Sequence, residues 1–316
     1  MKAVIASKEG ARLVDVPQPE AGADQLLVRV HAAALNRADL RTLQLAQDEV
    51  IGMEWAGEVV DVGPNVEGLH LGDRVMCSGK GAFAEFAVTD WGRAIVIPDP
   101  AMSFERAASM MLALQTMHNA VATHGQIQKG DTVLIHGASS GVGLMAAQIA
   151  RYMGARAVIG SSRSASRREA LVARGFDLVL DSTDPQWTDQ AIEFTAGKGV
   201  DVAIDQVAGP NFNQLLKVAA LRGRIINVGR LGGATGTFDF ELHAQKRISY
   251  TGVTFRTRTV EEVRELTKRM WDDLSPALAA SKLTMPLDKV FPLEHAQQAL
   301  ERMAANEHLG KIILKM

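Results

Sequence analysis

The segment Thr132-Val-Leu-Ile-His-Gly-Ala-Ser-Ser-Gly-Val-Gly143 is the most informative part of this 316-residue chain. An apolar, strand-forming run leads into a turn of small residues, and a helical pattern follows the turn. Small side chains leave the backbone open to a phosphate, and a helix N-terminus offers free N–H groups and a positive dipole end. The segment therefore predicts a dinucleotide site, with an ordinary strand-to-helix turn as the alternative.

Apolar strand patterns and helical patterns alternate from this segment onward. Strands that are apolar throughout and alternate with helices form parallel sheets that are covered on both faces. The chain therefore contains a predicted doubly wound α/β domain. The expected strands lie at residues 132–135, 157–159, 178–180, 202–204 and 225–228.

The residues outside this alternation follow other patterns. Val- and Leu-rich runs at 26–32 and 56–62, with Gly and Pro turns between them, predict a β-rich domain. One helix is expected over 103–124, with Ser103 as its N-cap. An amphipathic helix marked by Leu293, Ala296, Leu300 and Met303 and a strand at 311–314 close the chain.

We therefore expect three consecutive parts in the fold. Residues 1–115 form the first part of the β-rich domain, residues 116–253 form the doubly wound domain, and residues 254–316 return to the β-rich domain. The strand expected at 247–254 alternates in polarity and is rich in Val, Ile and Tyr, which is typical of a sheet edge.

Composition argues against several classes of protein. Lys and Arg total 34 against 36 Asp and Glu, and both signs are scattered, which favours neither nucleic-acid binding nor a membrane surface. The single cysteine, Cys77, excludes an internal disulfide and a site built from several thiolates. The apolar start is too short for a signal peptide, and the run at 107–114 is too short to span a bilayer. We expect a cytoplasmic protein.

The segment after the second strand of the doubly wound domain indicates which dinucleotide is bound. Residues 160–168 contain hydroxyls and three arginines but no acidic residue. NAD enzymes place Asp or Glu there against the ribose 2′-OH, whereas Arg binds a 2′-phosphate through paired N–H donors. The segment predicts NADPH. The alternative is a solvated basic helix start, above all for Arg168.

The glycine turn by itself also fits the short-chain dehydrogenase pattern Gly-x-x-x-Gly-x-Gly. That family uses a Tyr-x-x-x-Lys pair. Tyr152 and Tyr250 are the only tyrosines, and they are followed four residues later by Arg156 and Thr254. The catalytic pair is absent, so this alternative is set aside.

Several motifs together resemble another family over nearly the whole chain. They are Ala34-Leu-Asn-Arg-Ala-Asp39, Gly52-Met-Glu-Trp-Ala-Gly-Glu-Val59, Gly68-Leu-His-Leu-Gly-Asp-Arg-Val75, Gly81-Ala-Phe-Ala-Glu-Phe86, Ile97-Pro-Asp-Pro100, the glycine turn, Gly199-Val-Asp-Val-Ala-Ile-Asp-Gln-Val207, Gly223-Arg-Ile-Ile-Asn-Val-Gly229 and Gly310-Lys-Ile-Ile-Leu314. In order and spacing they resemble the medium-chain dehydrogenase/reductase superfamily, and within it the zinc-independent quinone oxidoreductase (zeta-crystallin-like) group. The resemblance implies a GroES-like β domain and a Rossmann domain, with the cofactor in the cleft between them.

The same resemblance bears on metal binding. The alcohol dehydrogenase branch holds zinc through two cysteines and a histidine, at positions that match Asn36, Met53 and roughly Leu112 here. An amide, a thioether and an alkyl group do not form a zinc site. We therefore expect no metal. Without a Lewis acid to stabilise an alkoxide, the expected acceptor is already electrophilic, such as a quinone or an activated C=C bond.

The resemblance also implies which residues bind the cofactor, NADPH. For Lys311 the alternative is an ordinary surface lysine. The expected cofactor residues are Thr116, Ala138, Ser139, Ser140, Gly141, Val142, Gly143, Ser162, Arg163, Arg167, Val207, Val228, Gly229, Phe255 and Lys311.

Three residues are candidates for catalysis. Asn36 is expected to hydrogen-bond the acceptor oxygen, where negative charge develops. His118 or water supplies a proton, and Arg41 holds an acidic group of the substrate. The alternatives are an Asn that only holds a loop, a helix histidine satisfied by the fold, and a solvated arginine.

The expected function is therefore an NADPH-dependent quinone or enone reductase. Two alternatives remain open, an enoyl-thioester reductase and a non-catalytic NADPH-binding or structural protein. Family resemblance also implies a homodimer formed through the edge strand at 247–254.

Overall fold

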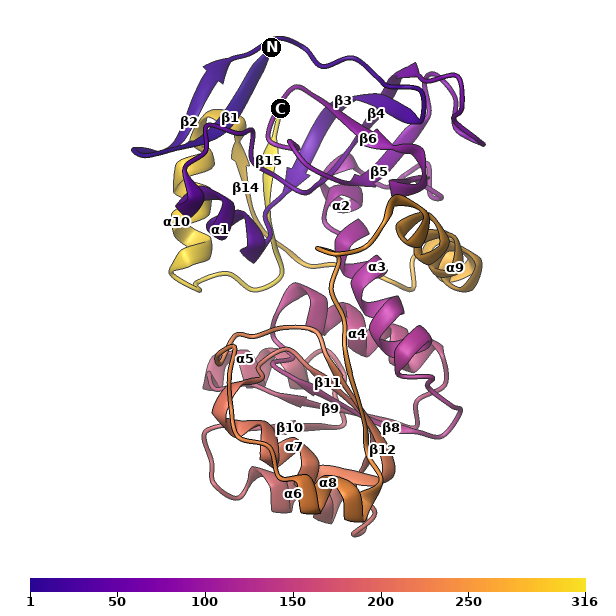
Figure 1. Cartoon of the computed structure of the whole chain (residues 1–316), viewed down its shortest axis with the longest axis vertical. Helices are drawn as coiled ribbons and strands as arrows, with labels where there is room; N and C mark the ends of the chain where they lie inside the picture. Colours follow the sequence, from indigo (N-terminus) through magenta and orange to yellow (C-terminus); the bar gives the residue numbers. More distant parts are fainter. The chain divides into compact units, whose positions relative to one another are not determined.

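The computed structural model describes residues 1–316, which form two compact units (Figure 1). The β unit consists of residues 1–113 and 258–316, and the α/β unit consists of residues 114–257. The chain therefore leaves the β unit once and returns to it. None of the helices combines the length and the apolar character that crossing a bilayer requires.

The α/β unit contains a six-stranded sheet in the order β10-β9-β8-β11-β12-β13. All of its neighbouring strands run parallel. From β8 the chain adds β9 and β10 on one side of the sheet, and then β11, β12 and β13 on the other side of β8. The strand order therefore reverses between β8 and β11. In such sheets ligands bind beyond the carboxyl ends of the strands at this reversal. The strands are β8 (Thr132–His136), β9 (Ala157–Ser161), β10 (Leu178–Leu180), β11 (Val200–Asp205), β12 (Ala219–Asn227) and β13 (Ser249–Gly252).

The five predicted strands of this unit are confirmed. These strands are largely apolar because most of their residues are buried, and β8 and β9 have no exposed residue. Trp187 and Leu134 belong to a core that also holds residues of β11 and β12. The helices are α4 (Gly141–Tyr152), α5 (Ala165–Val172), α6 (Trp187–Phe194), η3 (Gly209–Asn211), α7 (Phe212–Val218) and α8 (Phe240–Lys246).

The helix expected over 103–124 is interrupted. Ser103 caps its start as predicted, accepting the N–H of Arg106. Ser109 ends the first piece because both its N–H and its hydroxyl donate to the carbonyl of Arg106, a local bond that competes with the helix. The pieces are α2 (Phe104–Ala108), α3 (Met111–His118) and the π-helical η2 (Asn119–His124), and the boundary between the units falls within α3.

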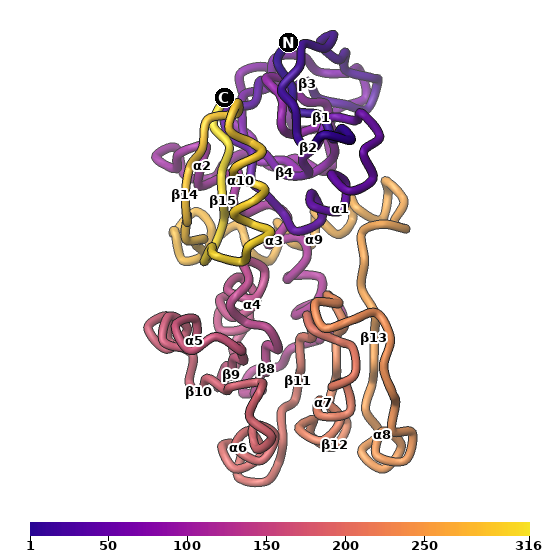
Figure 2. The backbone as a smooth tube through the Cα atoms, turned by 90° about the vertical axis from the view of Figure 1, so that its left-hand side faces the viewer, coloured from indigo at the N-terminus to yellow at the C-terminus, as the bar shows by residue number.

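The β unit contains a seven-stranded sheet in the order β14-β15-β3-β4-β5-β7, with β6 also paired to β3, and a separate hairpin of β1 and β2. The C-terminal strand β15 pairs antiparallel with β3, so the return of the chain completes this sheet (yellow in Figures 1 and 2). The strands are β1 (Lys2–Ser7), β2 (Gly10–Asp15), β3 (Gln25–Ala34), β4 (Glu54–Val62), β5 (Arg74–Ser78), β6 (Phe86–Asp90), β7 (Ala94–Val96), β14 (Leu287–Pro292) and β15 (Lys311–Lys315).

The predicted C-terminal amphipathic helix is also confirmed. It buries Ala296, Leu300 and Met303 in the same core as Trp55 and Phe83. The helices of this unit are α1 (Arg37–Leu45), η1 (Trp91–Arg93), α9 (Val260–Ala279), η4 (Leu293–His295) and α10 (Ala296–Ala304).

Candidate functional site

The glycine turn forms the predicted strand–turn–helix at the carboxyl end of β8. Ser140 caps α4, accepting the N–H of Gly143 at 3.1 Å through Oγ, and its hydroxyl donates to Gln206 Oε1 at 2.5 Å. A side chain at Gly143 would put its Cβ 2.6 Å from the carbonyl oxygen of Ala138, so only glycine fits between turn and helix. The first-turn N–H groups of a helix have no acceptor within it. This geometry suits an anionic pyrophosphate.

The end of β9 and the start of α5 carry the predicted serine and arginine cluster. Arg168 pairs with Asp181 at 2.9 Å and donates to the carbonyls of Ser162 and Arg163 at 3.1 and 3.0 Å. Arg168 is therefore held by the local fold, and its guanidinium is paired with Asp181 rather than fully solvated. Ser162 is buried, Arg163 is exposed and Arg167 is half-buried. Arg163 and Arg167 remain the candidates for a 2′-phosphate.

Asp205 organises the carboxyl ends of β11 and β12. Its side chain has no exposed surface, and it accepts the N–H groups of Val207 and Ala208 at 2.9 Å each and the amide of Asn227 at 3.2 Å. Its carbonyl also accepts the N–H groups that follow Asn227, at 2.7 and 3.1 Å. Three predicted cofactor positions are therefore bound by this one residue: Val207 by its carboxylate, and Val228 and Gly229 by its backbone carbonyl. The sequence interpretation missed Asp205, although an acidic residue that ends an apolar strand could have indicated it.

In the β unit, Lys311 and Glu54 form a buried ion pair. Lys311 Nζ lies 2.5 Å from Glu54 Oε2, and the two side chains are 6% and 0% exposed. The same ammonium donates to Asn36 Oδ1 at 2.7 Å and to the carbonyl of Leu35 at 3.3 Å. The alternative of a surface lysine is therefore wrong. Glu54 is a second residue that the sequence interpretation missed, although a charged residue in the apolar stretch before Trp55 could have signalled it.

Asn36 has both ends of its amide engaged by this pair. Its Nδ2 donates to Glu54 Oε2 at 3.0 Å and to the carbonyl of Ala34 at 3.3 Å, while Oδ1 accepts from Lys311. Asn36 was expected to donate a hydrogen bond to the oxygen of the substrate. The structure contradicts this expectation, because both hydrogens of Nδ2 are already donated to Glu54 and Ala34.

Asp39 completes this polar cluster. It is buried in the first turn of α1, and its Oδ2 accepts the backbone N–H of Asn36 at 2.6 Å. Burial raises the pKa of the Asp39 carboxyl to about 7, against the opposing effects of that hydrogen bond and of Lys311. Asp39 therefore exchanges its proton near neutral pH.

The remaining predicted residues are spread over several elements. Arg41 is exposed on α1 of the β unit. His118 lies at the end of α3 in the α/β unit and is 1% exposed, which favours the alternative of a histidine held by the fold. Thr116 on α3 and Phe255 after β13 are half-buried. Their roles stay predictions.

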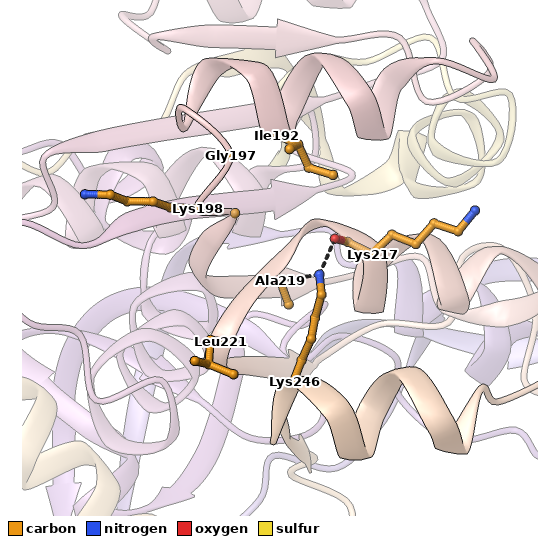
Figure 3. A pocket seen from close by; sticks show the side chains of 8 residues that line it. Ile192, Gly197, Lys198, Lys217, Ala219, Leu221 and Lys246 are labelled. Atoms are coloured by element: carbon orange, nitrogen blue, oxygen red, sulfur yellow. Dashed lines mark hydrogen bonds between the residues drawn. The ribbon is translucent and has the colours of Figure 1, made fainter.

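A surface pocket lies at the opposite, amino-terminal end of β11 and β12. Its lining includes Lys198, Lys217 and Lys246 (Figure 3). Lys246 Nζ donates to the carbonyls of Leu216, Lys217 and Ala219 at 3.1, 2.5 and 2.8 Å, so it holds the end of α7. In Figure 3 the side chains of Lys198 and Lys217 extend away from each other. The pocket lacks the convergent polar groups of a binding site.

Two family models match the chain. The alcohol dehydrogenase GroES-like domain matches residues 22–99, and the zinc-binding dehydrogenase domain matches residues 141–272. Together with the two units described above, these matches show that the chain belongs to the medium-chain dehydrogenase/reductase superfamily. The predicted fold class, a GroES-like domain with an inserted Rossmann domain, is confirmed.

The similar proteins include a polyketide synthase, of which the chain matches a segment, and solved structures of reductases. The chain is 32% identical over 304 residues to a mycocerosic acid synthase-like polyketide synthase of Mycobacterium tuberculosis, covering 93% of this chain but only 14% of that protein. A mycobacterial quinone oxidoreductase is 29% identical, with a TM-score of 0.88 and full coverage of both chains. The CurK enoyl reductase is 26% identical, with a TM-score of 0.86, covering 100% of this chain and 99% of that one.

The family name raises the question of zinc, and the residues here do not fit that ion. At the positions that match the zinc ligands, the Asn36 amide is bound by Glu54 and Lys311, and Leu112 offers only its backbone N–H, to Glu54 Oε1 at 2.8 Å. The cation that faces Glu54 is the ammonium of Lys311. No group of three or more His, Cys, Asp and Glu side chains is placed to hold a metal ion.

Proposed function

We propose that this protein is an NADPH-dependent reductase that transfers hydride to a quinone or to an activated C=C bond. The observation that carries the proposal is the cluster after β9, where Arg163 and Arg167 lie around the start of α5, no acidic residue lies between β9 and Glu169, and Asp181 is paired with Arg168. An unpaired carboxylate at this place would repel a 2′-phosphate, whereas arginine attracts it.

The α/β unit supplies the groups that would hold the dinucleotide. The amides of Gly141 and Val142 at the start of α4 would face the pyrophosphate, and Ser162, Arg163 and Arg167 the 2′-phosphate. NADPH, when bound, supplies a hydride that reduces the acceptor, and a proton from His118 or water completes the reduction.

An enoyl-thioester reductase is the second candidate. Its substrate is also an activated C=C bond, and the similarity to a polyketide synthase and to an enoyl reductase favours it. A quinone and an enoyl thioester differ in shape rather than in the hydride chemistry, so their relative kcat/KM values decide between the two candidates.

The test is an NADPH-consumption screen with quinones, enals, enones and enoyl thioesters. NADPH is expected to be preferred over NADH. The double variant Arg163→Ala/Arg167→Ala is expected to raise the KM for NADPH by about 10- to 100-fold, because each charge-assisted bond to the 2′-phosphate is lost, and to leave the KM for NADH unchanged.

Arg174→Ala is the matched control, because Arg174 is also exposed near α5 but donates to the carbonyl of Ala170. Equal affinity of the wild type for both dinucleotides would contradict the assignment of NADPH. Binding of NADPH without turnover of any acceptor would favour a non-catalytic protein. We also propose that the protein is a homodimer formed through β13.

A further inference from the structure

The buried ion pair includes Lys311, an expected cofactor residue, but the ammonium of Lys311 is bound by Glu54, Asn36 and the carbonyl of Leu35. Removing two charges from water is costly, and a buried ion pair is weak evidence for stability alone. Both carboxylate oxygens of Glu54 nonetheless accept hydrogen bonds. Oε1 accepts the N–H of Leu112, and Oε2 accepts from Lys311 and from Asn36. The side-chain amide of Asn36 is hydrogen-bonded to both members of the ion pair.

We propose that Glu54 and Lys311 are positioning residues that fix the Asn36 amide in one orientation, so that Asn36 meets its ligand as a hydrogen-bond acceptor. This inference rests on the proposed function for the identity of the ligand, but not for the orientation. The ligand group that Asn36 accepts from carries an N–H or O–H, such as the hydroxyl that a quinone oxygen becomes once it is reduced and protonated, and Asn36 does not donate to a developing oxyanion.

The charges on either side of the amide determine its orientation. Lysine can only donate and a carboxylate can only accept, so Oδ1 must face Lys311 and Nδ2 must face Glu54. A rotation by half a turn would place the amide NH₂ against an ammonium and the carbonyl against a carboxylate. Both hydrogens of Nδ2 are used, whereas Oδ1 keeps a second lone pair. Asn36 is half-buried, so part of its surface is open to a ligand.

The orientation can be tested without any activity. In ¹⁵N-labelled protein, the Asn36 side-chain signals are those that vanish in Asn36→Ala. The double variant Glu54→Gln/Lys311→Met removes both charges together, so that no lone charge is left buried. We expect the Asn36 amide signals to shift and their hydrogen exchange to accelerate by about tenfold or more.

Lys315→Met is the control, since Lys315 lies on the same strand with its side chain 62% exposed and is expected to leave these signals in place. Unchanged signals in the double variant would overturn the proposal.

Activity gives the second readout. The double variant is expected to lower kcat by about tenfold, through a misplaced amide, and to leave the Kd for NADPH within about twofold of the wild type. A rise in this Kd as large as the loss in kcat would make Lys311 a cofactor ligand and would overturn the proposal. If the wild type reduces no acceptor, the proposed function fails, and the amide signals still decide whether the pair fixes Asn36.

Discussion

Among single residues, Asp39 links the stability of the fold to pH. Its pKa is about 7 in the folded chain against an ordinary value of 3.8, chiefly because it is buried. Between these two pKa values, the Asp39 carboxyl is protonated in the folded state and ionised in the unfolded chain. The free energy of unfolding therefore falls as pH rises from about 4 to about 7, by about 1.4 kcal/mol per pH unit.

Asp39→Asn removes this titration while leaving an oxygen to accept the N–H of Asn36. We expect the variant to be more stable than the wild type at about pH 8 and to lose the fall in stability between about pH 4 and about pH 7. Urea unfolding at several pH values measures this. Asp61→Asn, an exposed position on β4, is the control. A wild-type slope retained in Asp39→Asn would contradict the assignment.

Sequence motifs indicated which residues belong to a candidate site more readily than which residues they contact. Asn36 and Lys311 were both singled out by motif, but they lie 275 positions apart, and Lys311 lies 257 positions from Glu54. Nothing in the local pattern of a C-terminal strand reveals that its lysine is buried against a carboxylate from the first hundred residues. The donor role expected for Asn36 failed for the same reason, because its hydrogens are taken by a partner that folding brings in.

Among secondary-structure elements, β11 and β12 are connected at their carboxyl ends by the side chain of Asp205. Asp205→Ala would leave the N–H groups of Val207 and Ala208 and the amide of Asn227 without their acceptor. We expect a loss of about 3 kcal/mol or more in the free energy of unfolding, together with weaker dinucleotide binding, because the loop after β11 loses two hydrogen bonds and the end of β12 loses one.

Asp205→Asn provides the comparison, since its oxygen can still accept the two backbone N–H groups, and it is expected to lose less. Urea unfolding and dinucleotide titration measure both variants. If Asp205→Ala lowers the free energy of unfolding by less than about 1 kcal/mol, these loops do not depend on the Asp205 side chain.

The strands of the α/β sheet could be predicted because local sequence patterns encode them. Apolar runs that alternate with helices follow from burial on both faces of a parallel sheet, so the strands at β8 to β12 are encoded by short stretches. The helix over 103–124 was predicted as one piece because the apolar periodicity continues past Ser109. The periodicity gives no sign that the hydroxyl of one serine can end a helix. Ser109 ends α2 by bonding back to Arg106.

For the whole molecule, the open edge of the α/β sheet bears on the oligomeric state. β13 is the last strand of its sheet and has β12 as its single neighbour (orange in Figure 2). Next to it, Phe240 and Tyr250 are 77% and 44% exposed, and the ring of Phe238 lies 4.9 and 6.4 Å from theirs. An unpaired strand edge beside exposed aromatic rings is a surface that a second copy can cover.

We therefore expect a dimer in sedimentation at about 10 µM, a concentration at which an interface of ordinary size stays formed. Phe240→Lys/Tyr250→Lys is expected to give a monomer, because two charges would be buried without partners. Val172→Lys is the matched control, since Val172 is 61% exposed on α5, which packs against β10 at the other end of the sheet, and it should remain a dimer. A wild type that sediments as a monomer, or a double variant that stays dimeric, would remove β13 as the interface.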